Sequence, residues 1–215
     1  MGRPRSSAAN VGLIERAADI IRRGGLVIVP TETFYALAAD PFQEAAVRKI
    51  FVAKSRDASK PLPLIASSRT AVSEVVVAPD QWIDALMDAF WPGSLTMLLW
   101  PNRAVSRLIS GRSGKIGVRV PPRCAAQALA EACGGWICAT SANLAGYPSA
   151  DRVAMIAPEV REAAGLVMDL GPTPGGKPST VVEPDDEGIR IIREGVVRTS
   201  ELKAFARQWG RKVWR

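Results

Sequence analysis

Hydroxyl-bearing side chains are concentrated in three short segments, Thr31-Glu32-Thr33, Thr140-Ser141-Ala142-Asn143 and Lys177-Pro178-Ser179-Thr180. Each segment follows or adjoins an apolar run that predicts a buried strand. Ligands of open α/β sheets bind beyond the carboxyl ends of the strands, so residues in these positions are candidates for a site. Short polar side chains and freed backbone N–H groups suit carboxylates and phosphates. A capping or turn role is the alternative for each segment taken alone.

Four cations extend this pattern. Lys54, Arg56 and Lys60 lie at or just beyond the end of a predicted helix, where they could complement the helix macrodipole or bind a nucleotide triphosphate. Arg119 lies inside the strand-like run Ile-Gly-Val-Arg-Val, among apolar neighbours. A charged side chain in such a place must be paired or must face a ligand.

The composition excludes several kinds of chemistry. The sequence contains no histidine, which rules out Ser-His-Asp and Cys-His nucleophiles, histidine general bases and most catalytic zinc sites. Cys124, Cys133 and Cys138 lack Cys-x-x-Cys spacing and are expected to be buried free thiols. The chemistry must therefore use lysine, arginine, hydroxyl, carboxylate or backbone groups, and we predict no protein-bound zinc or haem and no metal ligands.

The elements that would position these residues alternate between helix and strand along most of the chain. This alternation favours an α/β fold with parallel or mixed strand pairing, in a single domain that covers residues 1–215. The segment 30–41 is predicted to be a loop, and the basic residues from Arg207 onward a loose, frayed tail. Helices are expected at 11–23, 43–54, 79–90, 122–133, 152–164 and from 200, and strands at 26–29, 62–66, 94–100, 116–120, 136–139, 166–170, 180–183 and 189–193.

The net charge of +7 and the pI near 9.8 favour polyanionic partners, either nucleotide phosphates or RNA. Residues 103–123 contain six basic residues and no acidic one, although a solvated basic face would look the same. No apolar run approaches the roughly 20 residues of a membrane-spanning helix. Charged residues also interrupt the first 20 positions, so we expect no secretory signal and a cytoplasmic protein without a membrane partner.

Seven motifs, taken in order and spacing, resemble the YrdC/Sua5 family from about residue 12 to about residue 197. The lysine-x-arginine group combined with a later Ser-x-Asn is the most specific part of the resemblance. The motifs are PTETFYALAAD, AVRKIFVAKSRDASKPL, FWPGSLTMLL, IGVRVP, ATSANLAGYPS, PSTVVE and IIREG.

The resemblance implies a twisted mixed parallel and antiparallel sheet, with helices on its faces and a basic concave cavity. It also implies synthesis of threonylcarbamoyl-AMP and pyrophosphate from L-threonine, bicarbonate and ATP, for N6-threonylcarbamoyladenosine in tRNA. ATP would be a substrate with Mg²⁺ on its phosphates, and tRNA and the downstream threonylcarbamoyl-transfer enzyme are further possible partners. Catalysis would consist mostly of positioning and charge neutralisation.

The same resemblance implies roles for individual residues. Lys54 and Arg56 would be catalytic. Threonine would be bound by Thr31, Arg119 and Ser179, and ATP by Lys54, Arg56, Lys60, Ser141, Asn143, Ser149 and Arg193.

The chain departs from the family pattern at several positions. Ala36 and Ala38 replace glycines in Tyr-Gly-Leu-Gly-Ala, and Ser55 and Asp57 replace a glycine and a proline beside Arg56. A methyl group matters wherever the backbone needs positive φ or touches a ligand. Ile65 or a neighbour stands where some relatives have histidine. The extra C-terminal domain of longer relatives is not expected, which corresponds to the short form.

Two other functions fit the same residues. One is an RNA-binding module of the same fold, whose affinity would fall steeply with salt and would not depend on threonine. The other is a divergent carbamoyl-transfer enzyme, although such enzymes need additional domains for which 215 residues leave no space.

Overall fold

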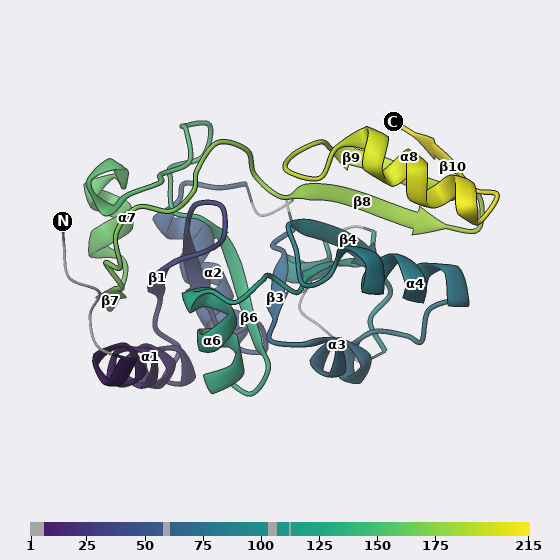
Figure 1. The fold of residues 1–215 in the computed structure, drawn as a ribbon. Coiled ribbons are helices and arrows are strands. Elements are labelled where there is room, and N and C mark those ends of the chain that lie inside the picture. Colours follow the sequence, from purple (N-terminus) through teal and green to yellow (C-terminus); the bar gives the residue numbers. More distant parts are fainter. Residues whose placement is uncertain (1–6, 58–60, 103–106, 112) are drawn as a thin grey trace.

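The computed structural model describes residues 7–57, 61–102, 107–111 and 113–215 (Figure 1). A ten-stranded mixed sheet organises them in the order β10-β9-β8-β4-β5-β3-β6-β2-β1-β7. Pairings β1–β7, β3–β5, β4–β8 and β9–β10 are parallel, and the other five are antiparallel. The strands are β1 Val27–Pro30, β2 Tyr35–Ala39, β3 Leu64–Ala66, β4 Leu95–Leu99, β5 Ile116–Arg119, β6 Trp136–Ser141, β7 Leu166–Val167, β8 Thr180–Asp185, β9 Gly188–Arg193 and β10 Lys212–Trp214.

Helices pack on both faces of this sheet (Figure 1). They are α1 Ser7–Arg22, α2 Glu44–Ala53, α3 Arg69–Val75, α4 Gln81–Phe90, α5 Arg107–Ser110, α6 Ala125–Ala132, α7 Pro158–Glu162 and α8 Thr199–Gln208, with a 3₁₀ turn, η1, at Val153–Met155. The architecture is therefore a single mixed α/β domain with one open sheet, and the α/β class with mixed strand pairing is the one that the alternating pattern predicted.

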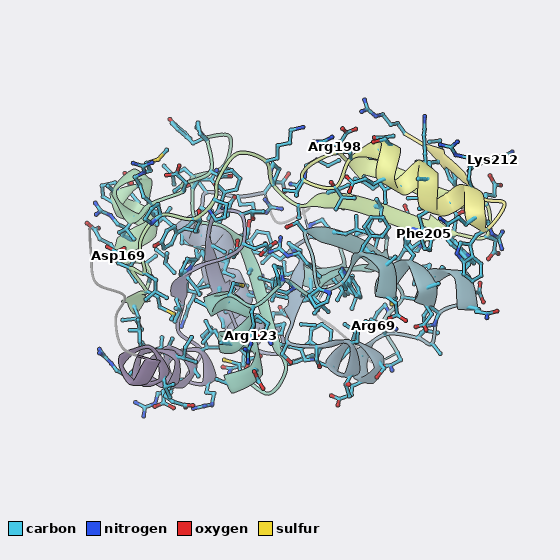
Figure 2. All side chains as sticks on the ribbon, in the orientation of Figure 1. Arg69, Arg123, Asp169, Arg198, Phe205 and Lys212 are labelled. Atoms are coloured by element: carbon cyan, nitrogen blue, oxygen red, sulfur yellow. The ribbon has the colours of Figure 1, made fainter. Side chains whose placement is uncertain are left out.

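One face of the sheet is covered along most of its width. Leu37, Leu64, Met97 and Val182 point to this face and join a large apolar cluster with side chains of α2, α3, α4 and α8. Phe205 of α8 points toward α4, where its ring meets Phe90 edge to face with 5.9 Å between the centroids (Figure 2). Burial of these side chains from water is the main force that holds the helices in place.

The opposite face is covered only in part. The apolar cluster on that side unites α1 and α6 with Val27, Ala36, Ile65 and Ile137, which belong to β1, β2, β3 and β6. Among the described residues, none from β4, β5, β8 or β9 joins this cluster. Because Ile65 pairs with Arg119, alternation along the strands places the Arg119 side chain on this uncovered part of the face.

Several sequence predictions were wrong in detail. The predicted loop 30–41 contains β2, a fully buried central strand. Both of its faces are covered, so it lacks the polar alternation that marks a strand. The predicted helix 152–164 is divided into η1 and α7, which begins at Pro158. The short helices α3 and α5 were not predicted.

The C-terminus also differs from the predicted loose tail. Residues 212–214 form β10, which extends the sheet through parallel pairing with β9. Lys212 lies at the outer end of the molecule (Figure 2), opposite Gly188. A Cβ atom at Gly188 would lie 2.1 Å from the Lys212 carbonyl oxygen, so this pairing requires glycine. Within the described part of the chain, no helix is both long and apolar enough to cross a bilayer.

Candidate functional site

A cavity of about 250 Å³ is lined by residues of β2, β3, β4, β5, β6 and β9 and of the segments beside them. Residues from both halves of the sheet and from distant parts of the sequence surround it. Its lining contains three arginines, seven hydroxyl-bearing residues besides Tyr35, and no carboxylate among the described residues. The lining residues are Thr31, Thr33, Phe34, Tyr35, Ala36, Arg56, Pro63, Leu64, Ile65, Thr96, Arg119, Ala139, Thr140, Ser141, Ser149, Pro178, Ser179 and Arg193.

Arg119 is held at the wall of the cavity by a buried ion pair. Its Nη1 lies 3.0 Å from Oε1 of Glu32, and the two side chains are 11% and 8% exposed. The Ser94 hydroxyl donates a hydrogen bond of 3.1 Å to the same oxygen. The sequence predicted that an arginine inside an apolar strand is either paired or faces a ligand, and Glu32 is the pairing partner.

Arg193 lies beside Arg119 and helps to shape the same wall. It donates to the Ser179 carbonyl oxygen at 2.8 Å and contacts the Ser179 hydroxyl at 3.4 Å. That hydroxyl lies 3.0 Å from the hydroxyl of Thr96. Burial, and then the positive charge of Arg119, lower the pKa of Arg193, so the two guanidinium groups favour an anion between them.

The turn between β1 and β2 supplies Thr31 and Thr33. The Thr31 hydroxyl donates to the Phe34 carbonyl at 2.7 Å and accepts from the backbone N–H groups of Thr33 and Phe34. These bonds satisfy the turn locally, which is the turn role left open at the sequence level. Both threonines nevertheless line the cavity.

Lys54 lies behind the cavity rather than in its lining. It is 2% exposed, and its ammonium group donates to the carbonyl oxygens of Ser141 and Asn143 and, at 3.3 Å, to Oδ1 of Asn143. The Ser141 hydroxyl also donates to Oδ1 of Asn143. Burial, and then the positive charge of Arg56, lower the pKa of Lys54 to about 8. Lys54 and Asn143 thus fix the turn that presents Ser141.

Arg56 reaches the cavity from the end of α2. The chain between it and Lys54 turns at Ser55, whose φ of +47° lies in the left-handed region that glycine adopts most easily. Ala36 and Ala38, which stand where the resemblance predicts glycine, lie in extended β2 without positive φ, and Ala36 lines the cavity. Among the described residues other than glycine, only Ser55 has positive φ.

The structure brings together most of the residues predicted for the site. Two of them, Lys54 and Asn143, lie behind the lining, and Lys60 lies outside the described residues. The cavity-lining members of the predicted set are Thr31, Arg56, Arg119, Ser141, Ser149, Ser179 and Arg193.

Sequence reasoning did not identify Thr96, Tyr35 or the pairing role of Glu32. Thr96 is a polar residue within a buried apolar strand, which was an available signal. Tyr35 lies in the undetected strand β2. Glu32 was noted only as part of a hydroxyl-rich segment, because its partner Arg119 is distant in the sequence.

The cysteines offer no reactive thiolate. All three are free, and burial raises the pKa of Cys133 to about 11 and that of Cys138 to about 12. Of the three, only Cys138 is fully buried. Among the described residues, no group of three acidic, cysteine or histidine side chains could hold a metal ion.

Taken together, the mixed sheet and its arginine- and hydroxyl-lined cavity define an α/β protein with a site suited to small anions. The Sua5/YciO/YrdC family model, described as telomere recombination, matches residues 19–195. The chain therefore belongs to the Sua5/YciO/YrdC family, as its motifs predicted.

Relatives within this family are similar over most of the chain. The threonylcarbamoyl-AMP synthase of Pyrococcus abyssi is 34% identical over 190 residues, which cover 88% of this chain and 56% of that protein. The Bacillus subtilis threonylcarbamoyl-AMP synthase is 32% identical, with 89% and 56% covered. The crystal structure of P. abyssi Sua5 complexed with L-threonine superposes with a TM-score of 0.86 at 32% identity, covering 94% of this chain and 58% of that one. The chain thus spans little more than half the length of these relatives.

Proposed function

We propose that this chain forms threonylcarbamoyl-AMP and pyrophosphate from L-threonine, bicarbonate and ATP. The observation that carries the proposal is the convergence of Arg56, Arg119 and Arg193 with several hydroxyl groups on one cavity. A relative that is similar over 94% of this chain is known in complex with L-threonine. The relatives named threonylcarbamoyl-AMP synthase support the same activity.

In this proposal threonine binds at the inner wall of the cavity. Arg119 would hold its carboxylate through the guanidinium edge that Glu32 leaves free, in a fork-shaped ion pair. The Ser179 hydroxyl, which lies beside Thr96, would add a hydrogen bond, and Thr31 would shape the adjoining turn. This arrangement leaves the threonine amine free to react.

ATP would occupy the side of the cavity where Arg56, Ser141, Ser149 and Arg193 lie. The guanidinium groups would neutralise phosphate charge, and Ser141 and Ser149 would orient the nucleotide by hydrogen bonds. Lys54 would act by holding the turn that carries Ser141, since its three N–H groups already have acceptors within that turn. Lys60 lies outside the described residues, and its predicted role in ATP binding stays a prediction.

The reaction requires no covalent enzyme intermediate. The threonine nitrogen attacks the bicarbonate carbon, and loss of water leaves a carbamate. A carbamate oxygen then attacks the α-phosphorus, and the bond from the α-phosphorus to the bridging oxygen breaks, which releases pyrophosphate. When two bound reactants are held at attack distance, proximity and charge neutralisation provide most of the rate acceleration.

Mg²⁺ is expected to accompany ATP, but the described lining residues offer it no carboxylate ligand. Mg²⁺ commonly keeps several waters and binds substrate phosphates, so it would be held mainly by the triphosphate. We assign no step to it. A cytoplasmic location, with tRNA and the downstream threonylcarbamoyl-transfer enzyme as further partners, completes the proposal.

The test uses the purified chain with α-labelled ATP, bicarbonate and threonine. We expect a labelled adenylate that forms only when threonine is present. Arg119→Met should abolish its formation, while Arg69→Ala should not, because Arg69 pairs with Asp84 and Asp88 and lies outside the cavity lining. Absence of a threonine-dependent product would contradict the proposed activity.

The RNA-binding alternative makes opposite predictions for the same sample. The affinity for RNA would fall steeply with rising salt concentration and would not depend on threonine. Adenylate formation equal with serine and threonine would instead indicate a paralogue with another acceptor.

A further inference from the structure

Glu32 occupies an unusual place relative to the cavity. Its neighbours Thr31 and Thr33 both line the cavity, but Glu32 itself does not. It lies behind Arg119 and contacts it through one carboxylate oxygen. A residue in this position cannot touch the substrate directly, but it can fix the side chain that does.

The ion pair between Glu32 and Arg119 uses one of the two carboxylate oxygens of Glu32. Glu32 uses Oε1 for both Arg119 Nη1 and Ser94 Oγ, at 3.0 and 3.1 Å. Among the described residues, its Oε2 and the Nε of Arg119 are buried without any hydrogen-bond partner. An unmatched buried donor is costly, so an anion that reached the Nε edge of Arg119 would be stabilised there.

This geometry decides which edge of the guanidinium is available. A planar guanidinium binds a carboxylate best through two parallel N–H groups. With Nη1 paired to Glu32, the edge formed by Nε and Nη2 is the one that we assign to the ligand. The positive charge of Arg119 contributes to lowering the pKa of Arg193, so the two guanidinium groups repel each other, and the negative charge of Glu32 beside Arg119 offsets this repulsion.

We propose that Glu32 is a positioning residue for amino-acid recognition: it holds Arg119 so that one guanidinium edge receives the substrate carboxylate. This inference rests on the proposed function, because it takes L-threonine as the ligand. Two properties follow. Threonine affinity should depend on the Glu32 acceptor, and ATP affinity should not.

The experiment measures L-threonine and ATP dissociation constants by calorimetry for the wild type and for Glu32→Met. Methionine keeps the volume of the side chain but removes the acceptor. We expect threonine binding to weaken about tenfold or more, the loss that follows when a supporting partner of a metal ligand is removed, with ATP affinity within about twofold of the wild type. Glu32→Gln keeps an acceptor oxygen and should restore part of the threonine affinity.

The matched control is Glu183→Met. Glu183 of β8 pairs with Lys115, the residue before β5, at 2.7 Å and also with Arg190 of β9. The Glu183 and Lys115 side chains are 14% and 13% exposed, and none of the three residues lines the cavity. This variant should bind threonine as the wild type does. Equal loss of threonine and ATP affinity in Glu32→Met would indicate a general structural role and would overturn the inference.

A double-mutant cycle keeps the test decisive even if a single variant is unstable. The Glu32→Met/Arg119→Met variant removes both buried charges together. Once Arg119 is absent, Glu32→Met should cause no further loss of threonine affinity. Additive losses of threonine affinity, or tighter threonine binding in Glu32→Met, would contradict the positioning role. No threonine binding by the wild type would instead contradict the proposed function itself.

Discussion

At the scale of single residues, Lys54 shows how burial changes the role of a charged group. Its sequence context indicated a phosphate ligand or a helix-end cation, but its ammonium is 2% exposed and binds backbone carbonyls of the 141–143 turn. The type of residue was therefore predictable, whereas its contacts were not. They depend on where α2 and β6 end in space, which local sequence does not specify.

The buried ammonium leads to a prediction about pH and stability. Burial lowers the pKa of Lys54 from 10.5 to about 8, so between these values the unfolded state binds more protons than the folded state. Stability from this group is therefore gained as pH rises from about 8 toward 10.5 and is lost as pH falls back through 8. The gain should be at most about 1.4 kcal/mol per pH unit.

The measurement compares urea unfolding of the wild type and Lys54→Met at pH 7, 8, 9 and 10. Methionine cannot titrate, so subtracting its values cancels the contributions of other groups. At pH 7 the variant should be less stable by about 2 kcal/mol, because buried carbonyls lose their donor. Above pH 8 the wild type should gain stability relative to the variant, and a constant difference across the series would contradict the lowered pKa.

At the scale of secondary-structure elements, periodicity predicted some parts well. The apolar stripe Ala46, Val47, Ile50 and Phe51 predicted α2, and all four side chains are buried. The short apolar run 116–120 predicted β5, whose last residue is Arg119. Both of these elements have one strong local signal that agrees with their tertiary surroundings.

Other elements could not be predicted from local pattern because their neighbours stabilise them. The Tyr-Ala-Leu-Ala-Ala sequence of β2 has little β-branched character and is held between β1 and β6. The strand β10 is three residues long and exists through pairing with β9. Tyr35 and Ala36 of β2 form part of the cavity wall. This part of the cavity therefore could not be predicted from the sequence either.

The segment after β9 controls the position of the cavity residues 178–179. A Cβ atom at Gly195 would lie 2.0 Å from the Pro178 carbonyl oxygen and 2.7 Å from the Ser179 carbonyl carbon. Gly195 also donates to the Thr180 hydroxyl at 2.8 Å. Because the obstructing atoms are backbone, a side chain here must displace the segment that carries Ser179.

We therefore expect Gly195→Ala to weaken threonine binding at least tenfold and to lower the free energy of unfolding by roughly 2 kcal/mol or more. Gly12→Ala is the control, because nothing lies within 4 Å of its added methyl group and it is exposed in α1. That change should raise stability by up to about 1 kcal/mol through helix propensity. Calorimetry and urea unfolding of both variants check this, and normal threonine affinity in Gly195→Ala would refute the close-packing argument.

At the scale of the whole molecule, the charge is distributed differently from the first expectation. The sequence analysis placed a basic stretch at 103–123. Residues 190–215, however, contain eight basic and two acidic residues, a net +6 of the total charge of +7. These residues form the end of the sheet and α8, and among them only Arg193 lines the cavity. Most of the net charge therefore lies outside the cavity. The net charge of the chain does not by itself predict an arginine-lined cavity.

The cavity, in contrast, joins the two halves of the sheet. Its lining runs from Thr31 to Arg193 and includes residues of β2, β3, β4, β5, β6 and β9. A ligand bound there contacts most of the sheet at once, so it should stabilise the whole fold rather than one part. Ligand at 100 times its dissociation constant adds about 2.7 kcal/mol to the free energy of unfolding.

We expect thermal unfolding of the wild type to be a single transition whose midpoint rises with added threonine and ATP together. For a chain of this size, about 2.7 kcal/mol corresponds to a rise of roughly 5–10 °C. The Arg69→Ala variant should show the same ligand-induced rise from its own starting midpoint, because Arg69 lies outside the cavity, whereas Arg119→Met should show little rise with threonine. Two transitions, of which only one responds to ligand, would mean that the halves unfold separately and that the cavity does not couple them.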